Sequence, residues 1–306
     1  MDIYLPIAEI SVNMAMLLGI GFAVGLLSGM FGVGGGFLVT PLLIFVGVPS
    51  AVAVATGGNQ VVASSVSGAM AHWRRKSIDF NLGLMLLLGG IAGSAVGVWL
   101  FKMLRESGHL DVVVGLSYTA FLGVVGVLML GESIRAIRRS RRGVLPAFRR
   151  PGQHNWIHGL PGKMRFKRSR LYISMIPVLV VGALGGLLAA LMGIGGGFIM
   201  VPAMIYLLRV PTNVVVGTSL FQIIFVTAIT TILHAATNGT VDIVLAFILM
   251  VGSVIGAQFG AQAGQRLKAE QMRALLALLV LVVCLRIMFQ LGVRPDDLYT
   301  ISVIGT

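Results

Sequence analysis

Two stretches decide the fold: GMFGVGGGFLVTPLL at residues 29–43 and ALMGIGGGFIMVPAM at residues 190–204. Each contains three consecutive glycines followed by a phenylalanine, and a proline comes four residues after that phenylalanine. The two stretches are separated by a constant offset of 161 residues (195 − 34). Because chance does not repeat such a pattern at one spacing, we infer that the chain contains two copies of one unit.

Similarity between the two halves continues beyond these stretches, with one or two inserted residues. The matched polar residues are Thr56, Gln60, His72 and Asp79 in the first half and Thr218, Gln222, His234 and Asp242 in the second. The matched glycines are Gly89, Gly93 and Gly97 in the first half and Gly252, Gly256 and Gly260 in the second. Glycines that recur every four residues allow helix backbones to pack closely in a membrane, so we interpret these series as packing surfaces.

The composition indicates an integral membrane protein. Hydrophobic residues make up 57% of the 306 residues, and the mean hydropathy is +0.97. Long stretches contain almost no charged residue: 14–71, 80–101, 171–208 and 210–265. A water-soluble domain would need charges along these stretches, whereas a lipid-covered protein does not.

Each unit is predicted to contain a helix, a glycine break, a shorter helix with a proline, and three further helices. The expected segments are 14–31, 35–48, 51–73, 80–103 and 111–131 in the first unit, and 172–192, 196–209, 212–235, 241–264 and 271–291 in the second. We therefore predict an all-α integral membrane protein. Its expected parts are a first transmembrane repeat at 1–131, a basic cytoplasmic loop at 132–170 and a second transmembrane repeat at 171–306.

Positive charge is concentrated between the two repeats. Of the 23 Lys and Arg residues in this chain of net charge +13, twelve lie between Arg135 and Arg170. A nucleic-acid-binding protein would spread such charge over a folded domain, so we expect no nucleic acid partner. The segment 135–170 is either a solvated topology signal or a site for anionic lipid or a cytosolic partner.

The distribution of basic residues also predicts the orientation of the repeats. Placing the basic loop in the cytoplasm puts Arg74, Arg75 and Lys76 on the same side. An inverted second repeat brings further basic residues to that side: Arg209, Arg266, Lys268 and Arg273. We therefore predict inverted repeats. The sequence leaves open whether the broken segments cross the membrane or form re-entrant hairpins.

The glycine breaks are the first candidate site. Interrupted segments at matching places in inverted repeats are typical of transporter substrate sites. The candidate glycines are Gly34, Gly35, Gly36, Gly195, Gly196 and Gly197. Each break precedes a helix whose first N–H groups and partial positive charge can bind an anion without a lysine. The alternative is a tight turn that serves packing alone.

Polar residues on the following helices extend this candidate site. They are Thr56, Asn59 and Gln60 in the first half and Thr218, Ser219 and Gln222 in the second. Amide side chains are costly to expose to lipid, so lining a polar path is one interpretation and hydrogen bonding between helices is the other. His72 and His234 are matched groups that could carry protons, or could be inert residues at the interface.

Acidic residues lie near the ends of the expected helices. Asp79, Glu106 and Asp242 are examples, and none of the ten Asp and Glu residues is placed in mid-membrane. This pattern argues against a cation carrier, which usually has a carboxylate inside the membrane. No cluster of acids and bases points to an enzyme, a metal site or a cofactor.

The paired glycine motifs, each followed by a Thr/Gln helix, resemble the TauE/SafE family of sulfite exporters over both repeats. The resemblance implies a transporter in the bacterial cytoplasmic membrane that exports sulfite or a small organosulfur anion such as sulfoacetate. It also implies that the candidate residues line the anion path. The long loop at 132–170 departs from the family, so the alternative is a non-transporting assembly subunit that uses this loop. We expect Ala or Leu at Gly35 or Gly196 to abolish transport without affecting folding.

Overall fold

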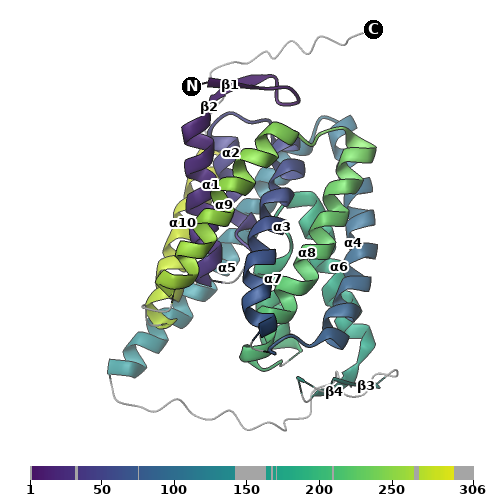
Figure 1. Ribbon diagram of the computed structural model, residues 1–306, viewed down its shortest axis with the longest axis vertical. Coiled ribbons are helices and arrows are strands. Elements are labelled where there is room, and N and C mark those ends of the chain that lie inside the picture. The colour runs from purple at the N-terminus through teal and green to yellow at the C-terminus, as the bar shows by residue number, and fades with distance from the viewer. Residues whose placement is uncertain are drawn as a thin grey trace.

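The computed structural model describes residues 2–31, 34–74, 76–141, 163–166, 168–169, 171–208, 210–264 and 269–292. They form a bundle of long helices with a short β-hairpin at either end (Figure 1). Some features singled out in the sequence lie outside the described residues: Arg75, Arg209, Arg266, Lys268 and positions 142–162, 167 and 170 of the basic loop.

The two halves contain the same elements in the same order. The first half comprises β1 (Asp2–Leu5), β2 (Ile10–Asn13), α1 (Met14–Phe31), α2 (Gly36–Phe45), α3 (Ser50–Arg74), α4 (Phe80–Glu106) and α5 (Leu110–Arg141). The second comprises β3 (Lys163–Phe166), β4 (Leu171–Ser174), α6 (Met175–Met192), α7 (Gly197–Pro202), the π-helix η2 (Ala203–Leu207), α8 (Thr212–Asn238), α9 (Ile243–Gly264) and α10 (Ala269–Gly292). The predicted all-α membrane class is confirmed, and α5 extends ten residues beyond its expected end at 131 (141 − 131).

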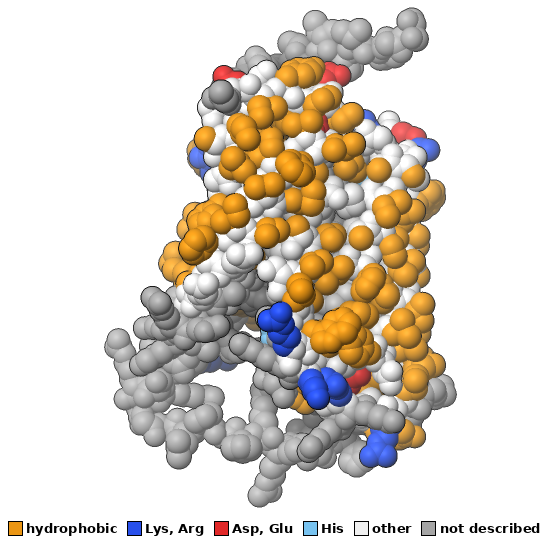
Figure 2. Space-filling view, in the orientation of Figure 1, with side chains coloured by type: hydrophobic (Ala, Val, Ile, Leu, Met, Phe, Trp, Pro, Cys, Tyr) orange, Lys and Arg blue, Asp and Glu red, His pale blue; other side chains and the backbone are white. Residues whose placement is uncertain are grey.

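Several helices are suited to a bilayer. Among the described residues, five helices are long and apolar enough to cross a membrane: α4, α5, α6, α8 and α9. Large side chains such as Trp99, Val127 and Phe247 are more than 60% exposed on their surfaces, as lipid-facing residues are. Hydrophobic side chains cover the middle of the visible face, and the charged ones lie toward its ends (Figure 2).

The expected helix at 196–209 is instead α7 followed by the wider turn η2. Pro202, the last residue of α7, has no N–H to donate to the preceding turn. Beyond it, Leu208 N–H donates to Ala203 O, five residues back, at 3.1 Å. Such a π-turn is typical of a helix that adapts to its neighbours, and it has no counterpart in α2.

Both β-hairpins were missed by the sequence analysis, and they extend the repeat toward the N-terminus. Asp2 pairs with Asn13 in the first hairpin, and Lys163 with Ser174 in the second, at the same offset of 161 (163 − 2). Asn13 and Ser174 then accept hydrogen bonds from the first turns of α1 and α6, at 3.0 and 3.2 Å. Figure 1 shows the two hairpins at opposite ends of the bundle.

The two halves are interlaced. Helix α1 packs mainly on α9, and α4 packs mainly on α6, so each of these pairs joins one half to the other. A Cβ added to Gly25 would lie 2.2 Å from Ser253 O, and one added to Gly93 would lie 1.9 Å from Ala183 O. The backbones are therefore in direct contact, which confirms the expected glycine packing surfaces.

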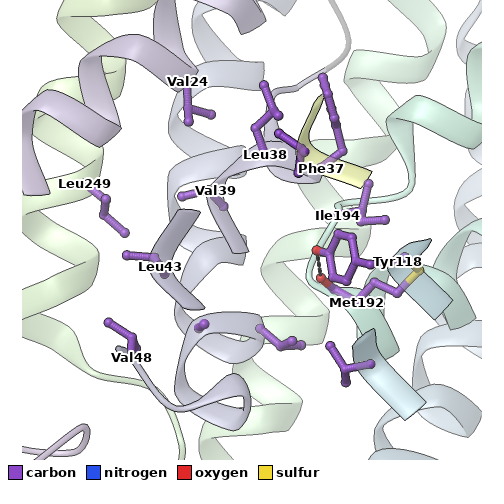
Figure 3. Close-up of a cluster of buried hydrophobic side chains, with 14 of the residues drawn as sticks. Val24, Phe37, Leu38, Val39, Leu43, Val48, Tyr118, Met192, Ile194 and Leu249 are labelled. Carbon is purple, nitrogen blue, oxygen red and sulfur yellow. Dashed lines mark hydrogen bonds between the residues drawn. The ribbon is translucent and has the colours of Figure 1, made fainter. Parts of the chain in front are cut away.

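Helix α2, which follows the first glycine turn, lies inside the protein rather than in lipid. Its residues from Gly36 to Pro41 are buried, within a cluster that includes Val24, Leu249 and Tyr118 (Figure 3). In the same cluster, the Tyr118 hydroxyl donates a hydrogen bond to Met192 O at the end of α6. Irregular backbone at membrane depth needs such protein surroundings, because lipid offers no hydrogen-bond partners.

Candidate functional site

The site is organised by two glycine turns that precede α2 and α7. Gly34 and Gly35 have φ angles of 84° and 70°, and Gly195 and Gly196 both have 72°. These left-handed conformations strain any residue with a Cβ. The first two glycines of each run are therefore required where α1 and α6 reverse direction.

Both turns lie against the same two side chains, one from each half. A Cβ on Gly34 would lie 3.4 Å from Val61 and 3.8 Å from Ile223, and a Cβ on Gly195 would lie 2.5 and 3.4 Å from the same residues. Val61 and Ile223 are themselves equivalent (223 − 61 = 162). The two turns therefore meet where α3 crosses α8.

The turns also touch each other. A Cβ on Gly36 would lie 2.5 Å from Ile194 O of the opposite turn. Directly after the turns, the equivalent residues Phe37 and Phe198 stack with their ring centroids 4.4 Å apart. The beginnings of α2 and α7 are thus held together across the centre of the molecule.

This meeting point lies in the middle of the bundle. Val61 is 11 residues into α3 (61 − 50), and Ile223 is 11 residues into α8 (223 − 212). At about 1.5 Å per residue, each is about 16 Å from the start of its helix, or half of a hydrocarbon core of about 30 Å.

The first broken segment begins and ends at the same end of the bundle. Thr56, near the start of α3, is hydrogen-bonded to Asp242, and Asp242 is hydrogen-bonded to Ile7 in the hairpin before α1. Helices α1 and α2 therefore enter and leave at one end, with their glycine turn at mid-depth. Of the two alternatives left open by the sequence, the depth of the turn favours a re-entrant hairpin.

Four buried side chains at this level have polar atoms without a hydrogen-bond partner. Gln60 and Gln222 are fully buried, and both polar atoms of each amide are unpaired. The hydroxyl groups of Ser65 and Thr227 are also buried and unpaired. Each pair is equivalent in the two repeats, at an offset of 162 (222 − 60 and 227 − 65). Leaving a buried polar group unpaired costs about 1–3 kcal/mol, and here that cost is present at matching positions in both halves.

The two hydroxyl groups face the glycine turns. Ser65 Oγ would lie 3.2 Å from a Cβ on Gly34, and Thr227 Oγ1 would lie 3.1 Å from a Cβ on Gly195. The amide of Gln222 lies on a neighbouring face of α8, where its Nε2 would be 3.0 Å from a Cβ on Gly90 of α4. All four side chains are neutral, and together they offer hydrogen-bond donors and acceptors at mid-depth.

Other predicted site residues already have partners. Thr56 Oγ1 and Thr218 Oγ1 accept hydrogen bonds from the backbone N–H groups of Asp242 and Asp79, each at 3.0 Å. They lie one helical turn before the two glutamines. Ser219 donates to Val216 O in its own helix at 3.0 Å. The hydroxyl groups of these three residues are therefore already hydrogen-bonded within the protein, unlike those of Ser65 and Thr227.

The other predicted site residues are Asn59, His72 and His234, and none of them belongs to the group of four unpaired side chains. Asn59 is partly buried beside Gln60. Because α3 and α8 are antiparallel, with His72 against Gly217, the histidines lie near opposite ends of this helix pair. His72 Nδ1 is 3.0 Å from Ser77 Oγ.

His234 is held through both ring nitrogens. Its Nε2 is 3.0 Å from Ala190 O, and its Nδ1 is 2.9 Å from Asn238 Nδ2. In the described part of the chain, no three His, Cys, Asp or Glu side chains gather closely enough to hold a metal ion.

The structure corrects one expectation about the glycines. A Cβ on Gly196 would lie 2.8 Å from Gly185 O, and one on Gly35 would lie 3.0 Å from Val24 and Ser28 side chains. Both residues also have positive φ. Substitution by Ala or Leu would therefore strain the fold, and the expectation that folding would be unaffected was wrong.

Ser65 and Thr227 belong to the hydroxyl residues that follow the two glutamines, and the sequence did not single them out as candidate site residues. Serine and threonine usually bond to their own helix, so neither stands out in the sequence. Their equivalence at the offset that relates Gln60 to Gln222 was the one available signal.

Similar proteins occur in distant organisms. The chain is 25% identical over 291 residues to "Probable membrane transporter protein YunE" of Bacillus subtilis, covering 91% of this chain and 98% of that protein. It is 29% identical over 268 residues to YjnA of the same organism, covering 86% and 94%. A probable membrane transporter protein of Xylella fastidiosa is 31% identical over 281 residues, covering 89% and 92%. No solved structure matches the chain significantly.

The family comparison covers the helices described above. The model of the family "Sulfite exporter TauE/SafE" matches residues 17–287, which include both glycine turns and the side chains of Gln60, Ser65, Gln222 and Thr227. The match agrees with the resemblance inferred from the two glycine motifs. This chain therefore belongs to the TauE/SafE sulfite exporter family of membrane transporters.

Proposed function

We propose that the protein exports a small sulfur-containing oxyanion, sulfite or an organosulfonate such as sulfoacetate, across the bacterial cytoplasmic membrane. The observation that carries this proposal is the set of buried, unpaired polar atoms on Gln60, Ser65, Gln222 and Thr227. They lie at mid-depth beside the two glycine turns. A bound oxyanion would accept hydrogen bonds from the amides and hydroxyls that now have none.

An anion suits this site better than a cation. The first N–H groups of α2 have no partner within the helix, and they carry the positive end of its dipole at the glycine turn. Carboxylates that would attract a cation lie elsewhere among the described residues, since Asp79 and Asp242 sit at helix starts. The glycines at 34–36 and 195–197 would bring backbone amides close to the substrate.

We further propose that the repeats are inverted in the membrane, with a two-fold axis near the plane of the bilayer. The two hairpins at opposite ends of the bundle support this arrangement (Figure 1). The end with β3 and β4 would face the cytoplasm, together with the basic loop at 132–170 between the repeats at 1–131 and 171–306. Segment 135–170 would bind anionic lipid or a cytosolic partner. Proton coupling through His72 and His234 would act at the two ends.

The test is anion flux in vesicles reconstituted with the purified protein. Sulfite, sulfoacetate and sulfate are supplied separately, and uptake is compared with that of protein-free vesicles. In Gln60→Leu and Gln222→Leu, we expect flux of the transported anion to fall at least about tenfold, because each change removes hydrogen bonds to a charged ligand. Thermal stability should not fall, since each change also removes an unpaired buried amide.

The matched control is Gln258→Leu, because Gln258 is an exposed glutamine on α9. Its flux should equal that of the unmodified protein. Absence of flux for every anion, or undiminished flux in both glutamine variants, would refute the proposal. In the former case, capture of a partner by segment 135–170 would favour the assembly subunit.

A further inference from the structure

Each half has one buried aspartate that caps its fourth helix. Asp79 Oδ1 accepts a hydrogen bond from Leu82 N at the start of α4, at 3.3 Å. Asp242 Oδ1 accepts one from Leu245 N at the start of α9, at 3.0 Å. The exposed fractions of Asp79 and Asp242 are 3% and 0%. A helix cap uses one oxygen of a carboxylate, so the other oxygen is available for a second role.

That second oxygen binds the hairpin of the opposite half. Asp242 Oδ2 accepts a hydrogen bond from Ile7 N, in the turn between β1 and β2, at 2.9 Å. Asp79 Oδ2 accepts two from Ser169, in the turn between β3 and β4: one from its N at 2.9 Å and one from its Oγ at 2.8 Å. The same bond is therefore made once at each end of the molecule.

The backbone of each aspartate is joined to a helix of the proposed site. Asp242 N–H donates to Thr56 Oγ1 on α3, and Asp79 N–H donates to Thr218 Oγ1 on α8. Thr56 is one turn from Gln60, and Thr218 is one turn from Gln222. Each aspartate thus connects an end hairpin with the helix that carries an unpaired glutamine.

The hairpins are continuous with the broken segments. Strand β2 leads directly into α1, and β4 leads directly into α6. Leu5 and Val12 of the first hairpin are buried in the core, as are their counterparts Phe166 and Ile173 in the second. A movement of either broken segment would therefore move its β-hairpin and strain the bond to the aspartate.

We propose that Asp242 and Asp79 are reciprocal latches that keep the two ends of the molecule closed. Asp242 closes the end with β1 and β2, and Asp79 closes the end with β3 and β4. This inference rests on the proposed transport function, because alternating access requires each end to open separately. In this structure both latches are formed and the unpaired site residues are buried, so both ends are closed.

Substitution of aspartate by asparagine breaks one bond selectively. Asparagine is as good a helix cap as aspartate, so its oxygen keeps the bond to the helix start. Its NH₂ group then faces Ile7 N–H in Asp242→Asn, or Ser169 N–H in Asp79→Asn, and two donors cannot bond to each other. In both variants the helix cap is retained and the bond to the hairpin N–H is lost, whereas in Asp79→Asn the Ser169 hydroxyl can still accept a hydrogen bond from the new NH₂ group.

The readout is the accessibility of the site from each side of the membrane. Ser65→Cys and Thr227→Cys are introduced separately into a Cys284→Ala background, since Cys284 is the sole cysteine of the chain. A membrane-impermeant thiol reagent is added to vesicles of known sidedness. Tyr4→Cys and Tyr172→Cys, both about 60% exposed on their hairpins, identify which end is being labelled.

We expect opposite effects from the two latch variants. Asp242→Asn should raise the labelling rate of the site cysteines about tenfold from the β1–β2 end and leave it unchanged from the other, as loss of a hydrogen bond to a carboxylate predicts. Asp79→Asn should raise labelling from the β3–β4 end only, and by less, because the Ser169 hydroxyl keeps one bond to the asparagine. Unchanged labelling in both variants, or an equal increase from both ends in either, would overturn the inference.

Two further sets of variants complete the test. Asp111→Asn is the control: it removes an exposed carboxylate from the first turn of α5 and should leave the labelling rate of the site cysteines unchanged from both ends. If an asparagine variant does not fold, Thr56→Val and Thr218→Val remove the bonds that join Asp242 and Asp79 to the site helices, and they should give the same two directions. Anion flux is measured separately. One-sided labelling without flux would refute the proposed function alone, whereas flux with unchanged labelling would refute the latches alone.

Discussion

At the glycine turns, a single added Cβ atom decides whether the backbone can adopt its observed conformation. Gly196 has a positive φ, and a Cβ there would also lie 2.8 Å from Gly185 O. Gly239 has a φ of 60°, in the same left-handed region, but nothing lies within 4 Å of its Cβ position. Comparing the two positions separates the cost of the conformation from the cost of the overlap.

We predict that Gly196→Ala lowers stability more than Gly239→Ala does. Both variants adopt a left-handed conformation at a cost of about 1–2 kcal/mol. Gly196→Ala adds an overlap with a backbone oxygen, which costs roughly a further 1–3 kcal/mol. Thermal unfolding of the purified variants in detergent measures the difference, and equal midpoints would contradict it.

Part of the site could be identified from the sequence, and part required the structure. Gln60 and Gln222 were identified because an amide facing lipid is costly. The sequence did not distinguish Thr56 from Ser65, because both are small hydroxyl residues on α3. They differ only in their surroundings, since Thr56 bonds to Asp242 across the bundle while Ser65 faces Gly34 without a partner.

Among the elements, glycine-rich faces determine which helices can pair. A Cβ on Gly256 would lie 2.1 Å from Phe22 O, and one on Gly93 would lie 1.9 Å from Ala183 O. At these positions no side chain fits without separating the helices. Gly19 of α1 has nothing within 4 Å of its Cβ position, although it lies in one of the same helices.

We expect Gly93→Ala and Gly256→Ala to unfold at lower temperature than the unmodified protein, because the α4–α6 or α1–α9 pair must move apart. Gly19→Ala should be neutral or should raise stability by up to about 1 kcal/mol, since alanine favours a helix more than glycine does. The measurement is the thermal midpoint of each variant. A Gly19→Ala variant as unstable as Gly93→Ala would rule out backbone contact as the cause.

The first and last residues of most helices could be predicted from the sequence, whereas the neighbours against which each helix packs could not. Apolar length and glycine breaks gave the positions of α1, α3 and α4 to within three residues. The repeat indicated that α4 and α9 are equivalent, but equivalence does not reveal that α1 packs on α9 rather than on α4. The hairpins were missed because their equivalent residues, such as Leu5 and Phe166, are alike in burial rather than in identity.

At the scale of the molecule, the two halves form one structural unit. The packing of α1 on α9 and α4 on α6 crosses between them, and so do the bonds from the two aspartates. Either half alone would leave these helix faces and polar groups without partners. The halves are therefore repeats in sequence but do not behave as separable domains.

We predict that fragments 1–150 and 151–306, divided within the basic loop, do not fold when expressed singly but assemble when expressed together. The cut leaves every contact between the halves available to the pair. Co-purification, a single peak in size-exclusion chromatography and resistance to protease measure assembly. A stable, protease-resistant 1–150 fragment on its own would contradict the interlaced arrangement.

The reciprocity of the Thr–Asp bonds has a consequence for the origin of the chain. One half contains both Thr56 and Asp79, and these are the two members of the bonds that it shares with Thr218 and Asp242. When each partner supplies the same two groups, identical subunits can satisfy one another. A gene encoding a single half would thus have sufficed to form these bonds in an ancestral homodimer, and its duplication and fusion would have preserved them while freeing each copy to diverge.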